Sequence, residues 1–194
     1  EGEALNPDGS VPINVTVSER KHRYFGVGAT VSSTDGAGIE GYWGHRNLFG
    51  RAEKLRIEGS ISRIGSTANL GMLNYNAKIL FEKPGVMGPA SKFISSVKAS
   101  FEHPNAYSSF SIDGRAGIRR ELTRKQTVSA EVRVAWSSVT DSFSPVVPVR
   151  HLLVSIPLEY VYDGRDNRLD PTSGYRFLVN VEPTRDMFSG ANFV

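Results

Sequence analysis

Five charged residues within the segment 163–170 have the types and spacing that could do chemistry: Asp163, Arg165, Asp166, Arg168 and Asp170. Three carboxylates this close together could bind a cation, but they lack the ligand spacing of a calcium loop. Aspartate and asparagine side chains also bond to nearby backbone N–H groups in turns. A rigid turn, held by ion pairs from its aspartates to Arg165 and Arg168, is therefore the simpler interpretation.

No other residues in the chain form a recognisable catalytic or metal-binding motif. The four histidines are far apart in the sequence, without metal-ligand spacing, and nothing pairs a serine with one of them: His22, His45, His103 and His151. Cysteine is absent, which excludes disulfides and thiol chemistry. The net charge is +3, with no Lys/Arg run to support nucleic-acid binding. We therefore expect no enzyme activity, no metal, no cofactor and no nucleic-acid partner.

The charged turn connects two segments in which apolar and polar residues alternate. Leu158, Tyr160 and Tyr162 precede it, and Phe177 and Val179 follow it. Alternation on both sides of a connection that contains Pro and Gly predicts a β-hairpin. Pro171 fixes φ in this connection, and Gly174 can take a positive φ.

The same alternation recurs along the chain and predicts an all-β protein of about nine strands. We expect strands near 24–33, 38–48, 54–64, 73–82, 92–102, 110–121, 128–137, 152–162 and 175–182. A soluble sandwich and a membrane barrel both produce this pattern. Strands of roughly 9–12 residues, with aromatic residues near their ends, favour the antiparallel transmembrane β-barrel. The mean hydropathy of −0.27 is compatible with that fold, because barrel strands alternate polar and apolar residues.

The first of these strands is rich in glycine. Its apolar residues Phe25, Val27, Ala29 and Val31 alternate with Gly26, Gly28 and Thr30. Glycine weakens a strand and permits bending or a close approach of another backbone. Two interpretations follow: a bent strand at a tight corner, or a weakly held edge strand that can part from its neighbour.

Two stretches of this sequence resemble the BamA/TamA superfamily of outer-membrane assembly and translocation barrels, which includes the two-partner secretion transporters. The run Asp163-Gly-Arg165-Asp166-Asn167, followed by Pro171 and Gly174, resembles their D-x-R-D-N-x-x-x-P-x-x-G segment. The stretch 26–55 is similar to the opening barrel hairpin of the TamA-like branch. The resemblance covers about residues 11–182.

This resemblance implies a partial barrel, with about 8–10 strands of a 16-stranded family barrel. Residues 1–22 would be the end of a periplasmic POTRA-like domain and its linker, and residues 23–194 the N-terminal portion of the barrel. The implied location is the bacterial outer membrane.

The implied function is assembly of outer-membrane proteins without a covalent step. A lateral-seam strand, made of Phe25, Gly26, Val27, Gly28, Ala29, Thr30 and Val31, would template strands of autotransporters or other β-barrel clients. The turn-motif residues Asp163, Arg165, Asp166, Asn167, Pro171 and Gly174 would brace the barrel. Implied partners are outer-membrane lipid, unfolded client strands and a periplasmic protein reached through the POTRA region, and free strand edges allow a homo-oligomer. The alternatives are a two-partner-type polypeptide secretion pore, an outer-membrane barrel enzyme and a soluble β-sandwich.

Overall fold

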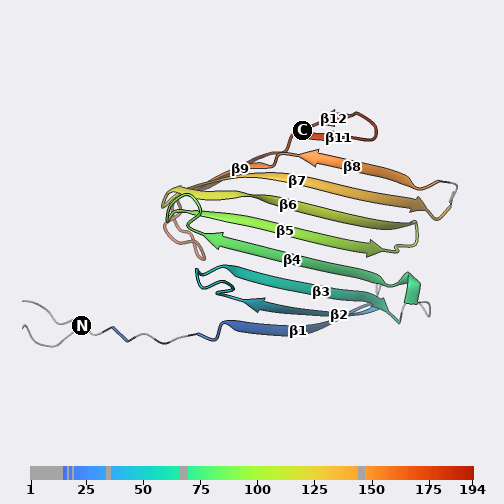
Figure 1. Ribbon diagram of the computed structural model, residues 1–194, viewed down its shortest axis with the longest axis horizontal. Helices are drawn as coiled ribbons and strands as arrows, with labels where there is room; N and C mark the ends of the chain where they lie inside the picture. The colour runs from blue at the N-terminus through green and yellow to red at the C-terminus, as the bar shows by residue number, and fades with distance from the viewer. Residues whose placement is uncertain (1–14, 17, 19, 34–35, 66–69, 144–146) are drawn as a thin grey trace, which may run out of the picture.

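The computed structural model describes residues 15–16, 18, 20–33, 36–65, 70–143 and 147–194 (Figure 1). Its strands are β1 (Arg23–Ser32), β2 (Gly36–His45), β3 (Lys54–Ile64), β4 (Asn74–Pro84), β5 (Ser91–Glu102), β6 (Tyr107–Thr123), β7 (Gln126–Asp141), β8 (Val149–Ser155), β9 (Leu158–Asp163), β10 (Arg176–Val181), β11 (Thr184–Asp186) and β12 (Asn192–Phe193). A short 3₁₀ helix, η1 (Leu70–Met72), precedes β4. No helix in these ranges has the length and apolar composition to cross a membrane. Of the expected POTRA-like end and linker, residues 1–22, only 15–16, 18 and 20–22 are among the described residues.

The strands form one antiparallel sheet, as predicted, and β1 to β8 pair in chain order (Figure 1). The eighth predicted strand was expected to be continuous, and this was wrong: it divides at Ile156–Pro157 into β8 and β9. Both parts pair with the long strand β7. The next strand divides at Pro183 into β10 and β11. Proline has no N–H to donate to a ladder, so both breaks occur where a proline enters the strand.

Strand alternation gives the sheet one apolar face and one polar face. In a single row across β1–β5, the apolar face carries Phe25, Trp43, Ile57, Ile79 and Val97. The adjacent row on the polar face carries Tyr42, Glu58, Lys78 and Lys98, and then Asp113 on β6. Since the side-chain period of a strand is two, this register keeps every apolar residue of the row on one side.

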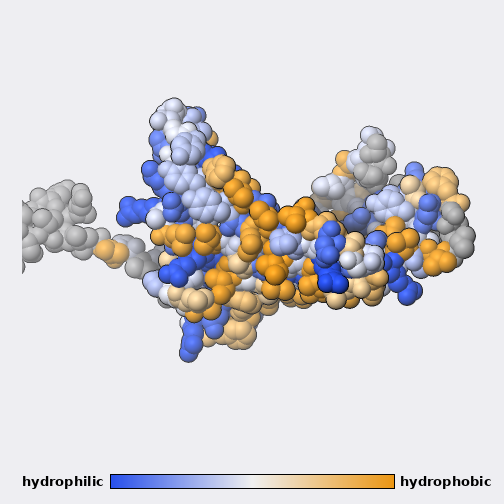
Figure 2. Space-filling model, turned by 90° about the horizontal axis from the view of Figure 1, so that it is seen from above, coloured by the Kyte–Doolittle hydropathy of each residue, from blue (hydrophilic) through white to orange (hydrophobic). Residues whose placement is uncertain are grey.

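The apolar face is not covered by a second layer. Leu73 is the one buried hydrophobic residue among those described, whereas Val27 is 86% exposed and Val97 is 51% exposed. Figure 2 shows apolar residues gathered across the middle of the molecule, with hydrophilic residues towards both ends. A soluble sandwich would bury this face against another sheet. The described sheet is instead the wall of a partial β-barrel, as the sequence predicted.

Two sets of turns lie at opposite ends of this wall. The connections at 46–53, 85–90, 124–125 and 164–175 are at the end where β1 begins, which is at the left in Figure 1. Because consecutive strands run antiparallel, the charged 164–175 turn and the entry into β1 share one end of the sheet.

Candidate functional site: the edge strand and the Arg-Asp-Asn turn

All of the predicted seam residues lie on β1, which forms one edge of the sheet. The ten residues of β1 each pair with a residue of β2, from Arg23 opposite His45 to Ser32 opposite Gly36. The other side of β1 pairs with no strand among the described residues. Phe25, Val27 and Val31 are 81–88% exposed on the apolar face. An unpaired row of N–H and C=O groups of this kind is a template for another strand.

Tyrosine rings cover the glycines at the β1–β2 pairing on the polar face. A Cβ atom at Gly26 would lie 2.5 Å from the ring of Tyr42, and one at Gly44 would overlap the ring of Tyr24. Tyr42 and Tyr24 therefore lie across the backbone of the opposite strand. On the side that faces β2, these glycines therefore allow close packing of the tyrosine rings. The interpretation of β1 as a weakly held edge strand stays a prediction.

Arginines hold both tyrosine rings in place. The guanidinium of Arg46 is 4.2 Å from the ring centre of Tyr24, and that of Arg56 is 4.0 Å from the ring centre of Tyr42. Such cation–π contacts stabilise the pair by about 0.5–1 kcal/mol at exposed sites. Arg46 also donates from its side chain to the Lys21 carbonyl at 3.0 Å and from its backbone N–H to the His22 carbonyl at 2.8 Å. The chain that enters β1 is thus fixed to the end of β2.

The predicted ion pairs of the Arg-Asp-Asn turn are present in the connection between β9 and β10. Arg165 donates to both oxygens of Asp163, at 2.8 and 2.9 Å. Arg168 approaches the same carboxylate at 3.7 Å. A two-pronged contact between a guanidinium and a carboxylate fixes geometry as well as charge. Asp163, at the end of β9, is therefore the anchor of this turn.

Asp166 and Asn167 satisfy the backbone N–H groups inside the turn. Asp166 accepts from the backbone N–H groups of Asn167, Thr172 and Ser173 at 2.8–3.1 Å and from the Thr172 hydroxyl at 2.6 Å. The Thr172 hydroxyl and these N–H groups hold the pKa of Asp166 at about 2. The Oδ1 atom of Asn167 accepts from the N–H of Leu169 at 2.9 Å. Asp166 and Asn167 therefore hold the segment 166–173 in its folded turn through hydrogen bonds within that segment.

Gly174 closes the turn in a conformation that other residues avoid. Its φ is +90°, and a Cβ atom there would overlap the carbonyl of Gly164. The Gly164 N–H donates to the Tyr175 carbonyl at 3.0 Å, and the rings of Tyr162 and Tyr175 stack at 5.2 Å between centres. Pro171 lies on the exposed side of the turn. The structure thus brings the six motif residues into one turn, and strands β2–β7 separate β9, where that turn begins, from β1.

A sequence match that includes the Arg-Asp-Asn turn identifies the family to which this chain belongs. Residues 47–194 match the Omp85 superfamily domain. The chain belongs to the Omp85 superfamily. Members of this superfamily are outer-membrane proteins that act in protein assembly and translocation. The match begins after β2, so the resemblance of the first hairpin to the TamA-like branch stays a prediction. No curated protein matches the chain.

On the polar face of the Omp85 wall, ion pairs connect β6, β7 and the segment between β10 and β11. Arg133 donates to Asp113, and it donates to Glu182 at 2.9 Å. Glu182 also accepts from the Ser155 hydroxyl at 2.7 Å. Sequence analysis did not identify this network, because its members are 20 to 49 residues apart and only the strand register brings them together.

The histidines make contacts that the sequence did not reveal. The rings of His22 and His45 stack with centres 6.0 Å apart. The sequence indicated that these two histidines are isolated from each other, and that interpretation was wrong. The Nδ1 atom of His151 is 2.8 Å from a carboxylate oxygen of Asp186. No group of three or more His, Cys, Asp or Glu residues in the described part of this Omp85 chain could hold a metal ion.

Proposed function

We propose that this Omp85 chain acts in the bacterial outer membrane as an assembly factor, which templates strands of autotransporters or other β-barrel clients at the free edge of β1. The observation that carries the proposal is the pairing of β1: ten residues pair with β2, and the opposite edge has no partner strand among those described. A client strand added to that edge gains backbone hydrogen bonds without any covalent step. No enzyme activity and no cofactor are part of this mechanism.

The contacts of β1 with β2 support a specific form of templating. Because Tyr24 and Tyr42 lie across Gly44 and Gly26, the β1–β2 hairpin holds together while the free edge receives the client. Phe25, Val27 and Val31 then present an apolar face that continues onto the new strand. A periplasmic partner would act through the chain that enters β1, which Arg46 attaches to β2. A second copy pairing edge to edge would occupy the same edge as a client.

Site-specific disulfide cross-linking tests the proposal. The chain has no cysteine, so each introduced thiol is unique. Ala29→Cys places a thiol on β1, and Ala77→Cys is a matched control on β4, a strand with partners on both sides. We expect an unfolded barrel client with one cysteine in its terminal strand to cross-link to A29C and not to A77C. Moving the client cysteine by two residues should shift the preferred partner from position 29 to position 27 or 31.

Equal cross-linking of A29C and A77C would contradict templating at β1. A two-partner-type secretion pore would give a different result: the client would pass through and cross-link at positions spread over the polar face, such as Ser60→Cys and Ser111→Cys.

A further inference from the structure

Three cationic side chains lie on the apolar face of the wall, all at the end of the sheet where β1 begins. They are Arg23 on β1, Lys83 on β4 and Arg120 on β6. Each is two residues beyond an apolar residue in its own strand, and so leaves the sheet on the same side as Phe25, Phe81 and Ile118 respectively. At the other end of these strands the last positions on this face are uncharged: Val31, Tyr75 and Ser108. The three cations therefore form a border along one end of the apolar face.

No carboxylate in the described part of β1–β7 lies on the apolar face. The strand register places the carboxylates of these strands on the polar face: Glu40, Glu58, Glu82, Glu102, Asp113, Glu121, Glu131 and Asp141. Glu53, in the connection before β3, lies near Lys83, but it is only 2% exposed and accepts from the Arg51 N–H at 2.9 Å. One buried carboxylate can offset part of the charge of Lys83, so the cationic border keeps a net positive charge.

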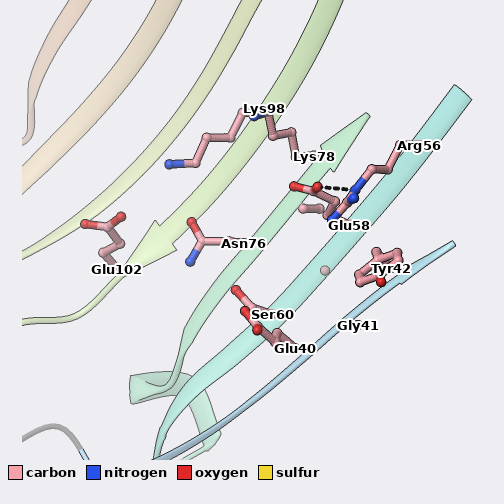
Figure 3. Close-up of a pocket in the computed structure, with 12 residues that line it drawn as sticks. Glu40, Gly41, Tyr42, Arg56, Glu58, Ser60, Asn76, Lys78, Lys98 and Glu102 are labelled. Carbon is pink, nitrogen blue, oxygen red and sulfur yellow. Dashed lines mark ion pairs between the residues drawn. The ribbon is translucent and has the colours of Figure 1, made fainter. Parts of the chain in front are cut away.

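The polar face carries charges of both signs instead. Figure 3 shows a hollow there whose lining contains three cations and three carboxylates: Arg56, Lys78, Lys98, Glu40, Glu58 and Glu102. At the end where β1 begins, the polar-face cations also have partners: Lys54 and Lys92 approach Glu82, and Arg119 approaches Glu159, at 3.6–3.9 Å. In contrast, the cations of the border form no ion pair with a described residue.

The cationic border follows an oblique line across the strands. Arg23 is in the same row of the register as Phe81, whereas Lys83 is two residues further out along β4. Arg120 is two residues beyond the row that contains Lys83. The aromatic residues of this face step outward in the same direction along the sheet: Trp43, Phe81, Phe93 and Tyr162. Barrel strands are tilted and aromatic girdles mark the membrane interface, so both series follow one membrane surface.

We propose that Arg23, Lys83 and Arg120 bind the phosphate groups of anionic phospholipids whose acyl chains lie against the apolar face. Long cationic side chains bury their stems along apolar surface and extend their charges to the interface. Guanidinium groups bind phosphate through two N–H donors, and basic clusters at a membrane surface attract anionic lipids.

The adjoining connections strengthen the attraction, because they add Arg51, Arg124 and Lys125, all of them exposed. A dissolved phosphate has no acyl chains to lie on the apolar face, so the ligand is the phospholipid. This site does not depend on strand templating at β1.

Electron paramagnetic resonance of spin-labelled lipids tests this proposal. The purified protein is reconstituted in phosphatidylcholine vesicles with a trace of spin-labelled phosphatidylglycerol or spin-labelled phosphatidylcholine. The motionally restricted fraction of the label measures the lipid in contact with the protein. We expect phosphatidylglycerol to associate about threefold more strongly than phosphatidylcholine at low salt, with the difference shrinking at high salt. The triple variant Arg23→Gln/Lys83→Gln/Arg120→Gln should remove this preference.

Lys54→Gln/Lys92→Gln/Arg119→Gln is the matched control variant. It removes the same charge at the same end of the sheet, but from the polar face. We expect this control to keep the preference for phosphatidylglycerol, and heat-dependent gel mobility will establish that both variants are folded. If the border variant does not fold, the three single variants replace it, and each should lower the preference.

Equal association of the two lipids with the unaltered protein, or equal losses in the two triple variants, would overturn the proposal. Loss of the preference in inorganic phosphate, at an ionic strength where chloride leaves it intact, would also overturn it, because it would identify a general anion site.

Discussion

The ring of Tyr42 on β2 lies over Gly26 on β1, where a Cβ atom would be 2.5 Å from the ring carbon Cζ. Each strand of the hairpin thus supplies a glycine where the other supplies a tyrosine, since Tyr24 covers Gly44 in the same way. This relationship explains the glycine content of the first strand by the packing of side chains on its polar face. It also determines how β1 can work, because the strand is held firmly on one side and free on the other.

Replacing Gly26 by valine should destabilise the β1–β2 hairpin. The new side chain must displace the Tyr42 ring and its contact with Arg56, which should cost about 1–3 kcal/mol. Urea unfolding of the protein in micelles measures this loss. Gly59→Val on β3 is the control, because a Cβ atom there meets only the Asn76 carbonyl at an ordinary 3.9 Å. A loss in G59V as large as that in G26V would contradict the role assigned to the tyrosine contact.

Replacing Gly174 by alanine should disrupt the Arg-Asp-Asn turn by more than the strain of a positive φ in a non-glycine residue. Its φ of +90° costs a non-glycine residue about 1 kcal/mol, and overlap with the Gly164 carbonyl adds to this. Gly190→Ala separates the two causes, since Gly190 has a φ of +75° with nothing within 4 Å of a Cβ atom. We expect proteolysis of the 164–175 turn to increase strongly in G174A, and proteolysis of the turn between β11 and β12 to increase only weakly in G190A. Equal sensitivity would mean that the backbone contact at Gly164 contributes nothing.

Acid should loosen the turn through Asp166. The pKa of this carboxyl is about 2, below its ordinary value of 3.8, so the folded turn favours the ionised form. The stabilisation is therefore complete above pH 4 and is lost as the pH falls from about 4 towards 2. The backbone amide resonances of Thr172 and Ser173, which donate to Asp166, should shift across this range. Asp166→Asn should abolish the titration, and an unchanged titration in D166N would assign it to another group.

Both tryptophans should contact lipid chains. Trp43 and Trp136 lie on the apolar face, opposite Phe25 and Ile112 in the strand register. In vesicles whose lipids carry bromine on the acyl chains, we expect strong quenching of the tryptophan fluorescence. Trp43→Phe leaves Trp136 as the reporter, and its emission should also be quenched. Full emission in brominated vesicles would show that another layer of protein covers this face.

Alternation along the chain was sufficient to predict the strands, because successive side chains of a strand point to opposite faces of the sheet, whichever strand it pairs with. Phe25, Val27 and Val31 were assigned to one face before any pairing was known, and the structure has them together on the apolar face. The break at Pro157 was missed, since Ile156 and Leu158 continue the alternation on both sides of it. The effect of a proline on the hydrogen bonds of a sheet can be judged only when the residue that pairs with it is known.

The contacts between strands depended on register, which the sequence pattern does not give. Lys78 and Lys98 are both simple polar positions in their own strands, and only the β4–β5 pairing makes them neighbours. In contrast, the Asp163–Arg165 pair lies within one short turn, so the sequence alone predicted it. Local interactions were therefore accessible from residue types and spacing, whereas contacts across the sheet required the fold.

The two prolines in adjacent strands have a mechanical consequence for the barrel wall. The Ile156 N–H donates to the Pro183 carbonyl at 3.1 Å, and the Glu131 N–H donates to the Pro157 carbonyl at 2.9 Å. The two interruptions therefore lie side by side, and β7 runs past them without a break. Neither proline has an N–H, so the ladder lacks a donor at both positions, while the two proline carbonyls still accept hydrogen bonds from the neighbouring strands. We therefore expect the wall beyond β7 to bend more easily at this line than elsewhere, with β8–β11 and β9–β10 each keeping its own register.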